Sequence, residues 1–231
     1  MDQFEYKGVK TVDGKKVFKI NILPEKRCNF DCVFCPIGRS PEKACTPRSF
    51  EGTGRAMEAL AAEIRRIRPD VVFINSKGEA LLHGEVRDII RLVQSLGCSV
   101  RLLTNGYLLG RSPFRETALS CEEIFCEIKA VSEESFQKMQ RPAEGFTLRE
   151  YVENMVAFRK DFRGKLIFEV TLIRGCNDDD ASVQKLCDVV RRLSPDVLRI
   201  ARMDEEPFCR RLNVTDARFE EASALLRAAL L

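Results

Sequence analysis

The strongest constraint on the fold of this 231-residue chain is a repeated change of hydrophobic periodicity along the sequence. Short apolar runs, typical of buried strands, alternate with longer stretches whose apolar residues recur every three or four positions, as in amphipathic helices. After a first strand that ends near residue 23, strands are expected over residues 71–75, 99–104, 124–128, 166–172 and 197–201. This succession predicts an α/β fold with a parallel sheet and helices outside it.

A β-hairpin is expected ahead of the first helix, over residues 4–23. Asp13-Gly14 is a turn dipeptide that favours two-residue hairpin loops, and the apolar second arm runs directly into Pro24. Counting that arm as the first strand gives six strand–helix units, too few for a closed eight-fold barrel. We therefore expect a partial, open (β/α)6 barrel of the TIM type. A single domain over residues 1–231 would consist of the hairpin, a loop over 24–54 and β/α units over 55–231.

Bulk composition excludes some classes of protein. The net charge of +3 is too small to indicate nucleic acid or a membrane surface as a partner, and no apolar run approaches the length of a membrane span. The first residues are polar and include acids, unlike a signal peptide. We therefore expect a cytoplasmic protein without membrane contact.

Ten cysteines require an explanation, because thiols are kept reduced in the cytoplasm and disulfides are not expected there. Four of them lie in or beside apolar stretches and are interpreted as small buried hydrophobic residues: Cys98, Cys121, Cys126 and Cys187. The sequence assigns no role to Cys45, Cys176 and Cys209. The other three are concentrated within residues 28–35, in the loop after the first strand, where parallel α/β folds place their chemistry.

These three residues, Cys28, Cys32 and Cys35, have the spacing C-x3-C-x2-C. Three thiolates on one short loop can each hold one corner of an iron–sulfur cubane, which normally takes four cysteine ligands. One iron is then left free to bind a molecule that is not protein. Two alternatives stay open on this reasoning: a zinc ion with a further, distant ligand, and a redox dithiol formed by Cys32 and Cys35.

The spacing closely resembles that of the radical S-adenosylmethionine (SAM) superfamily. The resemblance implies a [4Fe–4S] cluster on the three cysteines, with SAM bound to the open iron through its methionyl amino and carboxylate groups. It also implies reductive cleavage of SAM to a 5′-deoxyadenosyl radical that abstracts hydrogen from a substrate. The electron would come from an external reductant of the flavodoxin or ferredoxin type. Members commonly carry an aromatic residue near the adenine, before the third cysteine, and Phe34 occupies that position.

The loops after the second and third strands carry further matches to the superfamily. Gly78-Glu79 matches half of the Gly-Gly-Glu-Pro that typically follows the second strand, where backbone and glutamate meet the methionyl amino group of SAM. Lys77 and Ala80 depart from that pattern. Asn105 lies in a Thr-Asn-Gly tripeptide that members often carry after the third strand. The resemblance thus assigns Gly78, Glu79 and Asn105 to the SAM site.

Polar residues also stand at the later strand ends. Glu127 and Lys129 share one face of the fourth strand, because side chains alternate across a strand. If that face lines the barrel, Glu127 could accept from ribose hydroxyls and Lys129 could meet the SAM carboxylate; a surface ion pair between the two is the alternative. After the fifth strand, Arg174 is a candidate for a carboxylate of SAM or substrate. Asn177 or Asp178 is expected to cap the next helix.

The resemblance covers residues 17–205 and is closest to iron–sulfur oxidoreductases related to the radical SAM enzymes of tRNA wyosine synthesis. We expect a radical SAM oxidoreductase with one cluster, since Cys209 alone cannot supply an auxiliary one, and without an appended wyosine-forming segment. The substrate stays open among a peptide, a partner protein, a tRNA and a small molecule. The segment 127–129 resembles the Asp-Leu-Lys of glycyl-radical-enzyme activases, which favours a protein. The alternative from another class is a non-catalytic, zinc-stabilised α/β module that binds a partner.

Overall fold

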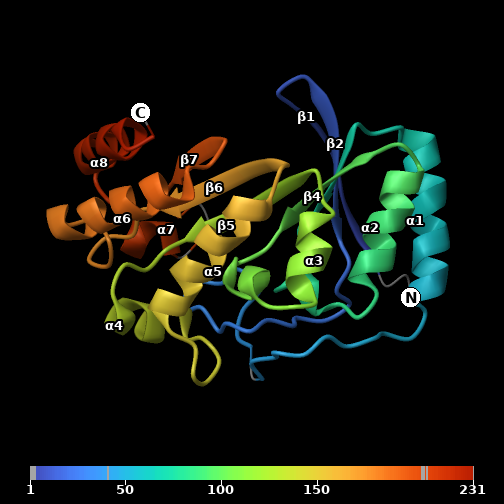
Figure 1. Ribbon diagram of the computed structural model, residues 1–231, viewed down its shortest axis with the longest axis horizontal. Helices are drawn as coiled ribbons and strands as arrows, with labels where there is room; N and C mark the ends of the chain where they lie inside the picture. Colours follow the sequence, from blue (N-terminus) through green and yellow to red (C-terminus); the bar gives the residue numbers. More distant parts are fainter. Residues whose placement is uncertain (1–3, 41, 204–205, 207, 231) are drawn as a thin grey trace.

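Seven strands form one sheet whose spatial order follows the chain, in a computed structural model that describes residues 4–40, 42–203, 206 and 208–230. The first two strands pair antiparallel and every later pair is parallel. The strands are β1 (Glu5–Val12), β2 (Lys15–Asn21), β3 (Val71–Ile74), β4 (Ser99–Leu103), β5 (Glu123–Ile128), β6 (Lys165–Thr171) and β7 (Val197–Ala201). The sheet curls into an open half-barrel (Figure 1), which confirms the predicted partial barrel.

The N-terminal hairpin is also confirmed, with one irregularity that the sequence pattern did not predict. Asp13 and Gly14 both have positive φ, as a tight two-residue hairpin turn requires. The pairing register of β1 with β2 shifts between Tyr6 and Val9, where Gly8 has a φ of +96°. An extra residue in one strand is a β-bulge, which bends the strand that carries it.

Helices connect the parallel strands and lie along the outer side of the curled sheet (Figure 1). The longer ones are α1 (Thr53–Ile67), α2 (Val86–Ser95), α3 (Phe114–Leu119), α5 (Leu148–Asp161), α6 (Asp180–Leu193) and α8 (Asp216–Ala228). Shorter helical turns are η1 (Ala80–Leu82), η2 (Tyr107–Gly110), α4 (Glu133–Ser135), η3 (Phe136–Gln140) and α7 (Phe208–Leu212). None of the helices in the described ranges is both long and apolar enough to cross a membrane.

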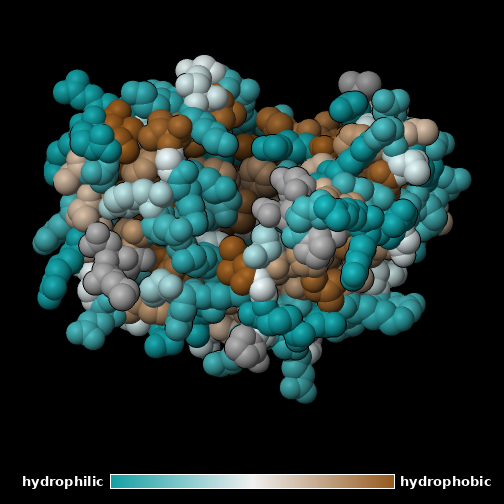
Figure 2. All heavy atoms as spheres, turned by 180° about the vertical axis from the view of Figure 1, so that it is seen from behind, coloured by the Kyte–Doolittle hydropathy of each residue, from teal (hydrophilic) through white to brown (hydrophobic). Residues whose placement is uncertain are grey.

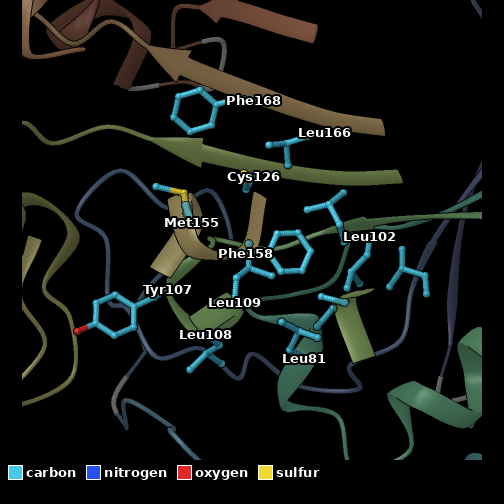
Figure 3. Close-up of a cluster of buried hydrophobic side chains, with 14 of the residues drawn as sticks. Leu81, Leu102, Tyr107, Leu108, Leu109, Cys126, Met155, Phe158, Leu166 and Phe168 are labelled. Atoms are coloured by element: carbon cyan, nitrogen blue, oxygen red, sulfur yellow. The ribbon is translucent and has the colours of Figure 1, made fainter. Parts of the chain in front are cut away.

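The hydrophobic core lies between the sheet and these helices. Leu102, Cys126 and Phe168 project from successive strands toward Met155 and Phe158 of α5 (Figure 3). Burying a large apolar side chain contributes roughly 1.5–3 kcal/mol, so this layer stabilises the curled sheet. The four cysteines interpreted as core residues are indeed buried: Cys98, Cys121, Cys126 and Cys187.

The other face of the sheet is concave and more polar. Because strand side chains alternate, residues such as Arg101, Glu123, Glu127 and Glu169 point away from the helical layer. Seen from behind, the molecule is hollowed, with apolar atoms inside the hollow and polar side chains around it (Figure 2). The candidate site lies at the carboxyl end of this concave side.

Candidate active site

A cavity of about 360 Å³ opens where the parallel strands end. This volume lies in the range of roughly 300–1,000 Å³ that is usual for small-molecule sites. The cavity is lined by the loop over residues 24–54, here called the cysteine loop, and by strand ends. The lining residues are Cys28, Phe30, Cys32, Phe34, Cys35, Pro36, Ile37, Asn75, Ser76, Gly78, Leu103, Asn105, Glu127, Lys129, Glu169, Thr171, Arg202 and Met203.

Cys28, Cys32 and Cys35 all contribute to this wall, each half-buried and free of a disulfide. In the part of the chain that the structure describes, no three His, Cys, Asp or Glu side chains are arranged to hold a single metal ion. A cubane needs no such convergence, since it binds each thiolate at a different corner. The three thiols beside one cavity therefore fit a [4Fe–4S] cluster together with a ligand for its open iron.

Two of the thiols are protonated in the absence of iron. Burial, with the nearby charge of Glu79, raises the pKa of Cys28 to about 12. Burial and the neighbouring Cys28 raise the pKa of Cys32 even further above its usual range. Because iron binds the thiolate form, cluster binding must release protons from both residues.

The cysteine loop is held on one side by the turn after β3. Arg27 N donates to Lys77 O at 3.0 Å and Glu79 N donates to Arg27 O at 2.8 Å. Gly78 lies opposite Arg27 in this short parallel bridge and has a φ of +119°. A Cβ at Gly78 would lie 2.0 Å from the Arg27 carbonyl oxygen, so only glycine permits this approach.

On the other side, the cysteine loop pairs with residues 139–143. Four backbone hydrogen bonds join the two segments. Val33 N donates to Met139 O at 2.8 Å, Asp31 N donates to both Gln140 O at 3.2 Å and Arg141 O at 3.1 Å, and Ala143 N donates to Asn29 O at 2.9 Å. Nothing in the local pattern of 139–143 predicts a partner so far away in sequence. The segment thus helps to fix the backbone that carries the three cysteines.

Phe30, between the first two cysteines, anchors the loop in an aromatic cluster. Its ring meets those of Tyr107, Phe136 and Tyr151 edge to face, with centroids 5.5–5.9 Å apart. The Tyr151 hydroxyl lies 2.5 Å from the backbone carbonyl oxygens of both Asn105 and Glu127, which share its one proton as acceptors. One cluster therefore ties the cysteine loop to the ends of β4 and β5.

Asp31 is the second anchor between the first two cysteines. Its buried carboxylate pairs with Arg39 at 2.6 Å and accepts from Ser40 N at 2.7 Å. Burial by itself would raise the pKa of Asp31, but these hydrogen bonds and the Arg39 charge outweigh it and lower the pKa. The ionised carboxylate thus folds residues 39–40 back onto the cysteine loop.

Glu79 lies behind the cavity wall rather than on it. Its carboxylate accepts from Leu81 N at 3.1 Å, Thr104 Oγ1 at 2.9 Å and Asn105 N at 2.9 Å, tying the end of β3 to the end of β4. Burial outweighs these bonds and raises the pKa of Glu79 to about 7. Asn105 does line the cavity, and its Nδ2 donates to Asn29 Oδ1 at 2.6 Å.

Glu127 and Lys129 meet in the cavity as an ion pair. The pair lies in the cavity wall and not on the outer surface, with only 11% of the Lys129 side chain exposed. Burial would lower the pKa of Lys129, but the charge and hydrogen bond of Glu127 outweigh it and raise the pKa. The Lys129 ammonium also lies 5.8 Å from the centre of the buried Phe34 ring. All three residues thus line the same cavity.

The loop after β6 differs from its sequence-based interpretation. Arg174 is exposed and does not line the cavity; its Nη2 donates to the Arg211 carbonyl at 2.7 Å. The predicted helix cap was wrong, since Asp179 caps α6. Asn177 is instead fully buried, where its amide donates to the carbonyls of Lys129 and Thr171 and accepts from Ile173 N. The side chain turns inward because a buried amide must find hydrogen-bond partners, and these three backbone groups supply them.

Several lining residues were not predicted from sequence: Asn75, Ser76, Glu169, Thr171, Arg202 and Met203. One signal was available for Glu169. It is a charged residue at an alternating position of an otherwise apolar strand, as Glu127 is. Its carboxylate lies 3.5 Å from the Arg199 guanidinium.

The chain resembles proteins of known sequence over most of its length. It is 25% identical to UPF0026 protein MJ1312 of Methanocaldococcus jannaschii over 78% of this chain and 57% of that protein. A probable GTP 3′,8-cyclase of Pyrobaculum aerophilum is also 25% identical, over 78% of this chain and 56% of its own length. The chain thus spans less than two thirds of the curated relatives that it matches.

Solved structures share the fold. TYW1 with a lysine-pyruvate adduct bound superimposes with a TM-score of 0.65 and 15% identity, over 92% of this chain and 73% of that one. A radical SAM methyltransferase from Sphaerobacter thermophilus superimposes with a TM-score of 0.66 and 17% identity, over 96% of this chain and 66% of that one. The sequence model of the Radical SAM superfamily matches residues 22–187, which include the cysteine loop and the ends of β3 to β6. The chain therefore belongs to the radical SAM superfamily, whose members use a [4Fe–4S] cluster and SAM.

Proposed function

We propose that this chain is an oxidoreductase that cleaves SAM reductively at a cluster on Cys28, Cys32 and Cys35 and abstracts hydrogen from a substrate. The observation that carries the proposal is the shared cavity, whose wall includes all three cysteines and the Glu127–Lys129 pair. Membership of the superfamily supports SAM cleavage in general. It makes the zinc-stabilised binding module the less favoured hypothesis, because the match includes both the cysteine loop and the strand ends facing it.

Each residue in the cavity has a chemical task in this proposal. When bound, the reduced cluster supplies the electron that breaks the C5′–S bond of SAM. The Lys129 ammonium offers a buried positive charge to the methionyl carboxylate, while Glu127 offers acceptors to the ribose hydroxyls. Phe34 provides an apolar wall for the adenine. Gly78 and Asn105 stay candidates for the methionyl end, whereas Glu79 and Arg174 would act from outside the cavity.

The route of the substrate follows from the open sheet. Strands β1 and β7 are the two edges of the half-barrel, and they do not pair with one another. A peptide, a partner protein or a tRNA larger than the cavity could place one reacting group beside the cluster through this opening. An external reductant of the flavodoxin or ferredoxin class would supply the electron.

The proposal is tested by anaerobic reconstitution with iron and sulfide, followed by an assay for dithionite-dependent 5′-deoxyadenosine. The wild type should form the product, and Cys32→Ala should fall to background because one cluster ligand is lost. Cys45→Ala is a matched control, since Cys45 is an exposed cysteine of the same loop that does not line the cavity. A Cys32→Ala protein with a full cluster and full activity would contradict the proposal. A colourless wild type with one zinc and no SAM affinity would support the binding module.

The substrate class is tested separately. Salt-dependent binding of tRNA that stimulates 5′-deoxyadenosine formation would indicate a tRNA substrate. A stable complex with a glycyl radical enzyme would indicate protein activation instead. In either case, transfer of deuterium from labelled substrate to 5′-deoxyadenosine would identify the hydrogen donor.

A further inference from the structure

Lys26 stands two positions before the first cysteine and touches a sulfur of the third. Its Nζ lies 3.2 Å from Cys35 Sγ and also donates to the carbonyl oxygen of Gly38. The acids nearest to it in sequence have other partners, since Glu25 pairs with Arg48 and Asp31 pairs with Arg39. The half-buried ammonium is therefore directed at the cysteine loop itself.

The sulfur of Cys28 has a different environment. It accepts from the Phe30 backbone N–H at 3.5 Å and from the Asn105 side-chain amide at 3.8 Å, and as a thiol it can donate to Asn29 Oδ1 at 3.8 Å. Both donors are neutral and both contacts are longer than that of Lys26. A charged donor makes a hydrogen bond roughly twice as strong as a neutral one. The structure thus provides a strong, cationic contact at Cys35 that Cys28 lacks.

We propose that Lys26 is a positioning residue that raises the reduction potential of the cluster through the Cys35 sulfur. The inference rests on the proposed function, because it requires a cluster on the three cysteines. Reduction adds one electron, taken from a flavodoxin- or ferredoxin-class donor, and no bond or proton changes place. A cation next to a ligand sulfur stabilises the added negative charge, and hydrogen bonds to sulfur are among the factors that set cluster potentials.

The test is a potentiometric titration of the reconstituted full-length chain, followed by electron paramagnetic resonance. Lys26→Met should bind as much iron and sulfide as the wild type, with a lower midpoint potential. The midpoint potential of Lys26→Gln, which keeps a neutral donor, should lie between these two values, and that of Lys26→Arg should be nearest to the wild-type value. Lys43→Met is the matched control: it removes one positive charge from an exposed side chain of the same loop and should leave the potential unchanged.

The outcomes separate this inference from the function on which it rests. A wild type that binds no cluster overturns both. A wild type that makes 5′-deoxyadenosine, together with equal potentials in wild type and Lys26→Met, overturns the role of Lys26 alone. Should Lys26→Met fail to hold a cluster, Lys26→Gln decides: an unchanged potential rejects the inference and a lowered one supports it. If the midpoint potential of Lys43→Met falls as much as that of Lys26→Met, the inference is also rejected, since loss of a positive charge anywhere on the loop would then suffice.

Discussion

Gly78 shows how much a single residue decides where the cysteine loop meets the end of β3. Its positive φ and its contact with the Arg27 carbonyl both require the absence of a Cβ. Gly8 is a useful contrast, because its φ is also positive, at +96°, yet a Cβ there would meet nothing within 4 Å. An alanine at Gly8 would introduce backbone strain alone, whereas an alanine at Gly78 would introduce both backbone strain and a steric clash.

We expect Gly78→Ala to reduce the free energy of unfolding by clearly more than Gly8→Ala. Strain in the left-handed region costs about 1–3 kcal/mol at either site. Only at Gly78 must the cysteine loop also move away, which should lower the iron content after reconstitution. Urea denaturation and iron analysis measure both effects. Equal losses of stability, with normal iron binding in both variants, would show that the Arg27 contact does not matter.

At the scale of elements, the cysteine loop depends on its neighbours because residues 24–40 and 42–52, as the structure describes them, form no continuous helix or strand. The turn after β3 holds one side, residues 139–143 hold the other, and Phe30 fills the aromatic cluster between β4, β5 and α5. Backbone hydrogen bonds and aromatic packing thereby replace regular secondary structure.

Replacing Phe30 by alanine should therefore loosen the whole loop. We expect a loss of about 3–5 kcal/mol in the free energy of unfolding, as for other buried phenylalanines. Ile37→Ala is the control, because Ile37 is an apolar residue of the same loop with 46% exposure and should change stability by less than about 0.5 kcal/mol. Denaturation curves of the metal-free proteins compare the two. A Phe30→Ala protein as stable as Ile37→Ala would show that the aromatic cluster does not anchor the loop.

At the scale of the whole molecule, the only histidine joins three distant parts of the chain. His83 is fully buried after η1, and its ring contacts Phe4 at the N-terminal end of the hairpin and Phe50 of the cysteine loop. Burial lowers the pKa of His83 below 6.5, while the nearby Glu85 pulls it upward to a lesser degree. The folded molecule thus keeps this imidazole neutral at a pH where the unfolded chain already binds a proton.

The contribution of His83 to stability should therefore fall as the pH is lowered from about 6.5 toward its folded pKa, by at most about 1.4 kcal/mol per pH unit. The raised pKa of Glu79 acts in the opposite direction and is common to the wild type and a His83 variant. His83→Asn retains an acceptor for the Glu85 N–H and cannot ionise, so its stability relative to that of the wild type should increase over the same interval. Denaturation at pH 7.5 and pH 5.5 gives the comparison. An equal change of stability with pH in wild type and variant would show that His83 makes no such contribution.

Local patterns in the sequence were sufficient for the positions of the strands along the chain, the hairpin turn, the buried cysteines and the cysteine motif. Each depends on residues a few positions apart. Periodicity indicates which face of an element is buried, and the spacing C-x3-C-x2-C indicates that three thiols can bind one cluster. The same reasoning placed Glu127 and Lys129 at the end of a strand, where a parallel sheet gathers its loops, whereas Phe34 was singled out by the resemblance to the superfamily.

Contacts between distant segments decided the rest. The pairing of residues 139–143 with the cysteine loop, the bond of Asn177 to the Lys129 carbonyl and the place of Glu79 behind the cavity wall have no local signature. Each arises because a buried polar group must find a partner, and that partner is supplied by whichever segment the folded chain brings near. Lys26 acquires its contact with Cys35 in the same way, through the return of the cysteine loop upon itself.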